Sequence, residues 1–159
     1  MENITYAGYV ALYGNDIDER DFSRLSFDAF RVMDDMTTGV DGYHKLRSAY
    51  PVEQYDAEAA SRCAYALVRL MKQIEDIAAS SGYTVREDGA MVGKRVSSVS
   101  SGAESISYAS GSAETVAEAA TASASARREA FWSLVREYLA GVKDANGVNM
   151  LYMGVYPRV

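Results

Sequence analysis

Cysteine, histidine and proline are almost missing from this sequence of 159 residues, which has one cysteine, one histidine and two prolines. A single cysteine excludes an intrachain disulfide, and a single histidine excludes a two-histidine metal site. A Cys/His catalytic pair would require Cys63 and His44 to meet. Long hydrophobic runs are missing too, since no stretch reaches the ~18 apolar residues that span a bilayer. We therefore expect no metal, no cofactor and no membrane contact.

Basic residues are the minority charge: 16 Lys and Arg stand against 22 Asp and Glu, a net charge of −6. Nucleic-acid-binding surfaces draw their affinity from Lys and Arg that displace counterions from phosphates, so this balance argues against such a surface. The excess of acid lies in residues 1–60, with five basic and twelve acidic side chains. The length suits one domain over 1–159. The first residues lack the pattern of a secretory leader, so we expect the chain in the cytosol or in an assembly built there.

Helical spacing of apolar residues covers most of the chain. It predicts a short helix over 5–13 and a longer amphipathic helix over 18–37, with Asp16 or Asp18 as its N-cap. Residues 40–50 favour a short helical turn. These elements indicate that the N-terminal part of the chain is helical throughout.

The longest periodic run covers 52–79, where apolar residues recur every three or four positions and charged residues occupy the opposite face. At ~1.5 Å per residue this predicts a helix about 40 Å long. Another apolar face follows in 127–142. We therefore predict a mainly α fold, a small helical bundle around one long central helix, whose body covers about 5–82 and 113–142.

Between these helical regions Val, Ile and Tyr are separated by Ser, a pattern typical of a weak β-hairpin over about 92–110. Its apolar positions are Val96, Val99, Ile106 and Tyr108. A two-stranded hairpin is marginally stable in water, so this insertion must lean on another element or remain mobile.

Residues 148–159 form a third kind of segment, apolar and aromatic, which we expect to be an extended C-terminal arm. Chain ends are usually polar and frayed, so an apolar end needs a surface that covers it. Either another chain or the arm's own domain could supply that surface, and the pattern favours another chain.

Catalytic groups are scarce. His44 lies in a polar loop, as an ordinary surface histidine would, and Cys63 falls on the apolar stripe of the long helix, as a small buried hydrophobe would. Asp34 and Asp35 are interpreted as solvated charges. The acidic run 15–21 lacks the glycine and the glutamate of a calcium loop, which favours helix-capping carboxylates. We expect no catalytic residue and no enzymatic activity.

Several short motifs follow one another along the chain. They are Thr5-Tyr6, Tyr9, Tyr13-Gly14, Ile17-Asp18-Glu19, Asp21-Phe22, Arg24-Leu25, Ala29, Met33-Asp34, Thr37, the Ala-containing helix 54–79, Ser105-Ile106-Ser107-Tyr108, Phe131, Val135, Tyr138-Leu139-Ala140-Gly141 and Leu151-Tyr152-Met153-Gly154-Val155. In this order the motifs resemble the head–tail connector (adaptor) proteins of long-tailed bacteriophages and prophages. The Ala/Ser-rich tract 113–126 departs from that pattern.

The resemblance implies a structural virion protein of the phage neck, made in the host cytoplasm and located at the portal vertex. It would form an oligomeric ring of about twelve copies under the portal protein, join capsid to tail, and let genomic DNA pass without sequence-specific binding. A stopper or tail-completion protein would bind below. The implied portal-docking residues are Leu151, Tyr152, Met153, Gly154 and Val155. The implied subunit contacts are Val96, Val99, Ile106 and Tyr108.

Two other functions stay open at this point. The chain could be a stopper or tail-completion protein of the same neck, for which we would expect more β-structure. It could also be an unrelated cytosolic helical module that binds another protein.

Overall fold

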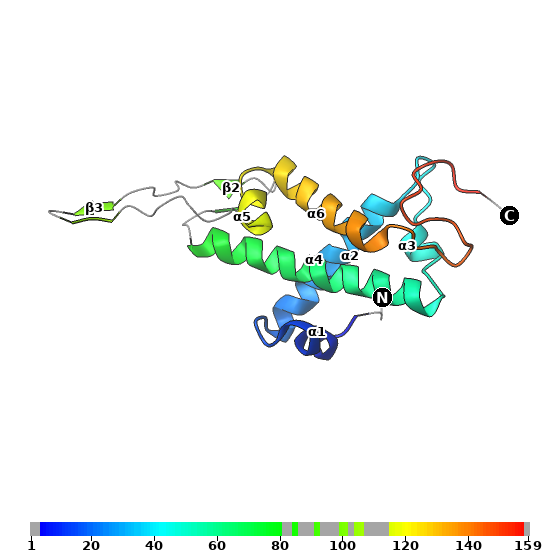
Figure 1. The fold of residues 1–159 in the computed structure, drawn as a ribbon, viewed down its shortest axis with the longest axis horizontal. Coiled ribbons are helices and arrows are strands. Elements are labelled where there is room, and N and C mark those ends of the chain that lie inside the picture. The colour runs from blue at the N-terminus through cyan, green and yellow to red at the C-terminus, as the bar shows by residue number, and fades with distance from the viewer. Residues whose placement is uncertain are drawn as a thin grey trace. The chain divides into compact units, whose positions relative to one another are not determined.

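A computed structural model describes residues 4–80, 84–85, 91–92, 99–101, 104–106 and 115–157 of the chain, and the side chains of 4–80 and 115–157. Most of these residues are helical, so the predicted mainly α class is confirmed (Figure 1). The elements in chain order are α1 (Tyr6–Tyr13), α2 (Glu19–Thr37), α3 (Lys45–Ser48), α4 (Gln54–Ser80), β1 (Thr84–Val85), β2 (Met91–Val92), β3 (Val99–Ser101), β4 (Glu104–Ile106), α5 (Val116–Ala120) and α6 (Ala124–Leu139).

The chain divides into two compact units, one formed by Met1–Lys72 with Phe131–Val159 and the other by Gln73–Ala130. Helices α4 and α6 each contribute residues to both units. The single domain over 1–159 stays a prediction. The first unit holds all the residues of the site described below.

Helices α1 and α2 begin where the sequence supplies a capping oxygen. The Thr5 hydroxyl accepts a hydrogen bond from the Gly8 amide (3.0 Å), and the Asp18 carboxylate accepts one from the Asp21 amide (2.7 Å). Each bond satisfies an amide that has no partner within its own helix. Of the two N-caps expected for the second helix, Asp18 is therefore the one used.

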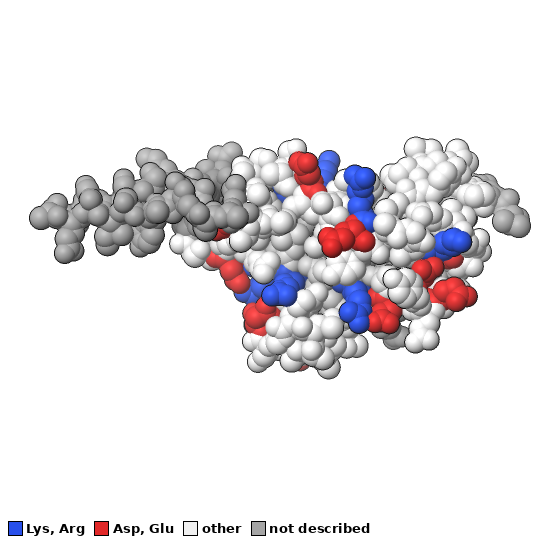
Figure 2. Space-filling model, in the orientation of Figure 1, with Lys and Arg blue, Asp and Glu red and all other residues white. Residues whose placement is uncertain are grey.

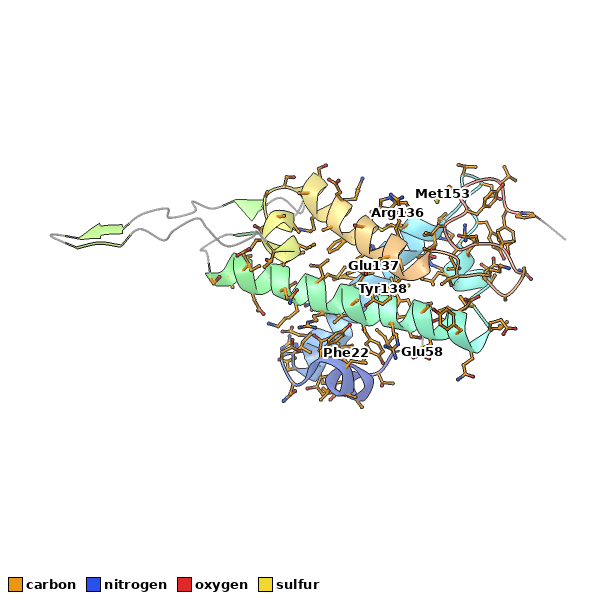
Figure 3. All side chains as sticks on the ribbon, in the orientation of Figure 1. Phe22, Glu58, Arg136, Glu137, Tyr138 and Met153 are labelled. Atoms are coloured by element: carbon orange, nitrogen blue, oxygen red, sulfur yellow. The ribbon has the colours of Figure 1, made fainter. Side chains whose placement is uncertain are left out.

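An aromatic cluster joins α1, α2 and α4. It consists of Tyr6, Tyr9, Phe22 and Tyr65, whose ring centroids lie 5.6 to 6.5 Å apart for Tyr9–Phe22, Tyr6–Phe22, Tyr9–Tyr65 and Phe22–Tyr65. The tilted and offset geometries are those that aromatic pairs prefer. Phe22 lies between α1 and α4, and Tyr9 is fully buried (Figure 3).

Helix α4 is the longest of the described helices and carries the stripe that its sequence predicts. Its burial in the first unit is wider than that stripe, because all six residues from Cys63 to Val68 are buried. The buried side chains include Ala60, Cys63, Ala64, Leu67, Val68, Leu70 and Met71. On the exposed side Arg62 pairs with Glu58 at 2.7 Å, one helical turn away.

The second unit contains α5 and two short antiparallel ladders. The Thr115 and Glu118 side chains each bind the other residue's amide, a capping box that starts α5. Strand β1 pairs with β2 over two residue pairs, and β3 pairs with β4 over three. These pairs differ from the single hairpin predicted over 92–110, which is not supported as a folded insertion. Ladders this short supply too few hydrogen bonds for a hairpin to be stable by itself.

Candidate docking surface

The chain turns sharply after α6. Gly141 has a φ of 84°, a conformation that favours glycine, and the Val142 amide donates to the Leu139 carbonyl at 3.2 Å. Residues 142–157, named here the C-terminal segment, then fold beside α3 (Figure 1). Val142 is buried, and its carbonyl accepts from the Met150 amide at 2.9 Å, while Met150 itself is fully buried. Met150 therefore anchors the segment just before residues 151–155.

Asp144 organises the tight loop between these two positions. Its Oδ1 accepts from the amides of Asn146 and Val148, both at 2.9 Å, and its backbone amide donates to the Val148 carbonyl at 2.8 Å. Gly147 supplies the positive φ, 78°, that the turn requires. Only 5% of Asp144 is exposed, so its carboxylate accepts hydrogen bonds from groups of the protein rather than from solvent.

Tyr156 anchors the segment just after residues 151–155. Its ring stacks on Tyr43 with centroids 3.9 Å apart, and its amide donates to Asp41 Oδ2 at 3.0 Å. Its hydroxyl donates to Asp144 Oδ2 at 2.6 Å and accepts from Asn146 Nδ2 at 2.9 Å. Burial raises the pKa of Tyr156 to about 12, and the Asp144 carboxylate acts in the same direction.

Between Met150 and Tyr156 the backbone is held against the loop that joins α2 and α3. The Val40 amide donates to the Met153 carbonyl at 3.0 Å. The buried Lys45 ammonium donates to the Tyr152 carbonyl. A Cβ on Gly39 would lie 2.7 Å from the carbonyl oxygen of Gly154, so glycine at position 39 allows the two backbones to touch.

These contacts contradict the prediction of an extended C-terminal arm. The arm expected over 148–159 is folded onto its own domain as far as the structure describes it, to residue 157. The physical reason is that its anchors find apolar and hydrogen-bonding partners in 39–45. Of the two covering surfaces that the sequence left open, the chain's own domain covers Met150 and Tyr156.

The five predicted portal-docking residues lie together between the two anchors. Three of them are exposed, Tyr152 by 46%, Met153 by 41% and Val155 by 67%, while Leu151 and Gly154 are half-buried. Met153 is labelled in Figure 3. The backbone of this loop is thus fixed while apolar side chains face solvent.

This loop is also free of charge. Residues 145–157 contain no Asp, Glu, Lys or Arg, although such residues make up 24% of the whole chain. Figure 2 shows a white stretch of surface at the upper right, where the segment lies beside the loop between α2 and α3. Val40, which is 76% exposed, belongs to that loop. An uncharged surface with exposed apolar side chains is suited to contact with another protein.

The structure describes two of the four predicted subunit-contact residues. Val99 and Ile106 are opposite each other in the β3–β4 ladder, where the backbone alone is described. Val96 and Tyr108 lie outside the described residues. The role of these four residues stays a prediction.

The burial of Asp34 is a feature that the sequence analysis did not predict. Asp34 was expected to be a solvated charge, but only 2% of it is exposed. Its Oδ2 lies 2.6 Å from Arg47 Nη2 and 2.8 Å from His44 Nδ1. The Thr38 hydroxyl lies 3.0 Å from the same imidazole nitrogen. The expectation was wrong because Asp34 shares a helical face with buried Met33 and Thr37, and no local pattern reveals partners ten residues away.

His44 and Cys63 do not meet the requirements of a catalytic pair. His44 is half-exposed just before α3, in line with the surface histidine that was predicted, and its Nδ1 lies 2.8 Å from Asp34 Oδ2. Cys63 is fully buried on α4, as predicted, and burial raises the pKa of its thiol to about 12. A buried thiol with so high a pKa is a poor nucleophile at neutral pH.

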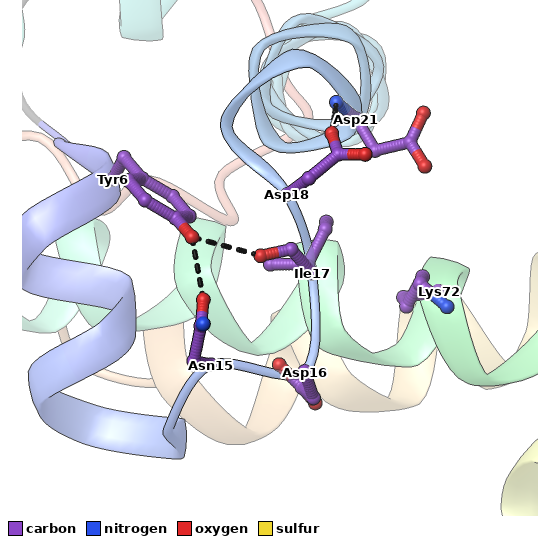
Figure 4. Close-up of a pocket in the computed structure, with 7 residues that line it drawn as sticks. All are labelled: Tyr6, Asn15, Asp16, Ile17, Asp18, Asp21 and Lys72. Atoms are coloured by element: carbon purple, nitrogen blue, oxygen red, sulfur yellow. Dashed lines mark hydrogen bonds between the residues drawn. The ribbon is translucent and has the colours of Figure 1, made fainter.

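The acidic residues at the start of α2 line a hollow (Figure 4). Its wall is formed by Tyr6, Asn15, Asp16, Ile17, Asp18, Asp21 and Lys72. The Tyr6 hydroxyl donates to Asn15 Oδ1 at 2.6 Å and lies 3.0 Å from the Ile17 carbonyl, while Asp18 caps α2. Within the described part of the chain no three His, Cys, Asp or Glu side chains are grouped as metal ligands.

Of the helices that the structure describes, none has the length and hydropathy of a membrane span. No family model matches the chain, and neither a curated protein nor a solved structure is significantly similar to it.

Proposed function

We propose that this protein is a structural component of a bacteriophage neck, a head–tail adaptor that binds the portal protein through residues 151–155. The order of the sequence motifs supports the proposal, and so does the mainly α fold. In this role the protein performs no catalysis. Copies form a ring of about twelve, and the genome passes through it without sequence-specific binding.

The observation that carries the proposal is a fixed backbone that presents uncharged apolar side chains. Tyr152, Met153 and Val155 are 41 to 67% exposed, although Met150 and Tyr156 on either side are buried. Binding to such a loop requires little further ordering of its backbone, which lowers the entropic cost of association. Each contact in a ring is repeated in every subunit, so modest individual affinities give strong binding overall.

The finer architecture belongs to the same proposal. In it, α4 is the central helix around which the others pack, and Val96, Val99, Ile106 and Tyr108 contact neighbouring subunits. The excess of acidic residues in 1–60 suits a conduit for DNA, because phosphates are repelled rather than held. The helical content favours an adaptor over a stopper, for which we expect more β-structure.

The direct test places a charge in the exposed loop. We expect Val155→Asp to abolish binding to purified rings of the portal protein encoded in the same genome, because burying an unpaired carboxylate at the interface is costly. Its melting temperature should stay within about 2 °C of the wild type, since Val155 is 67% exposed. Co-sedimentation and electron microscopy of the mixture measure the binding.

Val52→Asp is the matched control, because Val52 is 72% exposed and lies outside the C-terminal segment. It should bind portal rings as the wild type does. Equal loss in both variants would mean that the effect is general rather than local. If the wild type leaves portal rings bare, the adaptor function is refuted, and the protein-binding module becomes the better interpretation of the same surface.

A further inference from the structure

Lys45 is a buried cation beside residues 151–155, named here the docking loop. It is 1% exposed, and its ammonium donates a hydrogen bond to the Tyr152 carbonyl. The same nitrogen lies 5.9 Å from the centroid of the Tyr152 ring. A lysine is among the residues least often buried completely, so its presence in α3 calls for a reason.

The surroundings of Lys45 show how the charge is tolerated. Burial lowers the pKa of Lys45, while the carboxylates of Asp144 and Asp41 oppose that effect. Both carboxylates also bind Tyr156, Asp144 through the hydroxyl and Asp41 through the amide. The Lys45 ammonium binds the backbone at Tyr152, and the two carboxylates that favour its charge bind Tyr156. These three charged groups therefore hold the loop near both of its ends.

From this arrangement we infer that Lys45 is the positioning residue of the docking loop, and that binding to the portal requires the conformation that it fixes. Tyr152 is tied through its carbonyl, and its ring, which lies near the Lys45 ammonium and packs over Gly154, keeps 46% of the residue exposed. The inference concerns the same site and rests on the proposed function for its consequence in binding. Without the ammonium, the loop would have to be ordered when the portal binds, and the affinity would fall accordingly.

Lys45→Met tests this inference, because methionine fills a similar volume without donating a hydrogen bond. Two amides report on the attachment of the loop: Val40, which donates to Met153, and Tyr156, which donates to Asp41. In Lys45→Met we expect hydrogen exchange at both amides to be about tenfold faster, while amides in the first turns of α4 keep their rates. Binding to portal rings should weaken by about tenfold or more.

Lys143→Met is the control, since it removes the same charge from an exposed side chain of the same segment. It should change neither exchange at the two amides nor binding. Unchanged exchange or unchanged portal binding in Lys45→Met would overturn the inference, and so would equal acceleration in α4, which indicates general destabilisation. If the wild type itself does not bind portal rings, the proposed function fails, whereas the exchange rates still decide whether Lys45 fixes the loop.

Discussion

The aromatic cluster and the C-terminal segment are both rich in tyrosine, but different forces hold them in place. In the cluster, rings pack against rings, and Tyr9 and Phe22 are buried with at most 6% exposure. In the segment, only Met150 and Tyr156 are buried as large side chains beyond Val142, and hydrogen bonds from backbone groups, carboxylates and an ammonium hold it in place. The first region is stabilised by apolar burial, the second by polar contacts at a few points.

The difference suits the proposed roles of the two regions. A core of packed rings gives the body its stability and tolerates little change in volume. A segment held at a few points by its backbone leaves its side chains free to meet a partner. Substitutions should therefore affect overall stability strongly in the cluster, and should affect the presentation of the loop more than stability in the segment.

The largest effect is expected in the cluster. Phe22→Ala removes a ring that packs between Tyr6, Tyr9 and Tyr65. We expect the free energy of unfolding to fall by about 3–5 kcal/mol, because the surrounding rings cannot close the cavity. Urea denaturation followed by circular dichroism measures the change.

Phe27→Ala provides the comparison on the same helix, since Phe27 is 55% exposed. Its expected effect is about 0.5 kcal/mol or less. Similar losses in both variants would show that Phe22 does not belong to a tightly packed core.

A smaller effect is expected where polar contacts hold the segment. Asp144→Ala removes the acceptor for the amides of Asn146 and Val148 and for the Tyr156 hydroxyl. We expect the free energy of unfolding to fall by about 2–3 kcal/mol, because hydrogen bonds to a charged group are lost within the protein. Urea denaturation gives the total, and hydrogen exchange at residues 146–156 shows where the protection is lost.

Asp35→Ala is the matched control, because Asp35 is exposed on α2. It should leave both measurements near those of the wild type. If Asp144→Ala unfolds no more easily than this control, then the segment is held by its apolar anchors alone, and the contrast between the two regions disappears.

The same contrast explains which parts of the fold could be predicted from sequence. Helices α1, α2 and α4 follow from the spacing of apolar residues and from the caps at Thr5 and Asp18, all of which are local. The burial of Cys63 followed from its place on the apolar stripe. Local periodicity was sufficient wherever apolar packing decides the structure.

The position of the site along the sequence could be predicted, but the contacts that hold it could not. Residues 148–159 stood out as an apolar and aromatic segment, and the resemblance pointed to 151–155 within it. The segment's attachments nevertheless come from Lys45 and Asp41, 107 and 115 residues away from Tyr152 and Tyr156. Asp34 was expected to be a solvated charge, and the sequence offered no expectation for Lys45 or Asp144; the burial of all three depends on partners that no local pattern identifies. A long-range pairing of buried polar groups leaves no periodic signal in a single sequence.

The smallest predicted effect tests whether the Tyr156 hydroxyl matters apart from its ring. Tyr156→Phe keeps the stack on Tyr43 but loses the bond to Asp144, so the free energy of unfolding should fall by about 1 kcal/mol at pH 7. In the wild type the pKa of this hydroxyl is raised from 10.0 to about 12. The folded state therefore favours the protonated form, and the stability it contributes is complete below pH 10.0 and is lost as the pH rises towards about 12.

At about pH 11 that loss amounts to about 1 kcal/mol, so the stabilities of the wild type and Tyr156→Phe should converge as the pH rises above 10.0. Urea denaturation of both proteins from pH 7 to 11 measures the difference. Two parallel curves would mean that the hydroxyl titrates alike in the folded and unfolded protein. The ring stack and the backbone bond to Asp41 would then hold this end of the segment without help from the carboxylate of Asp144.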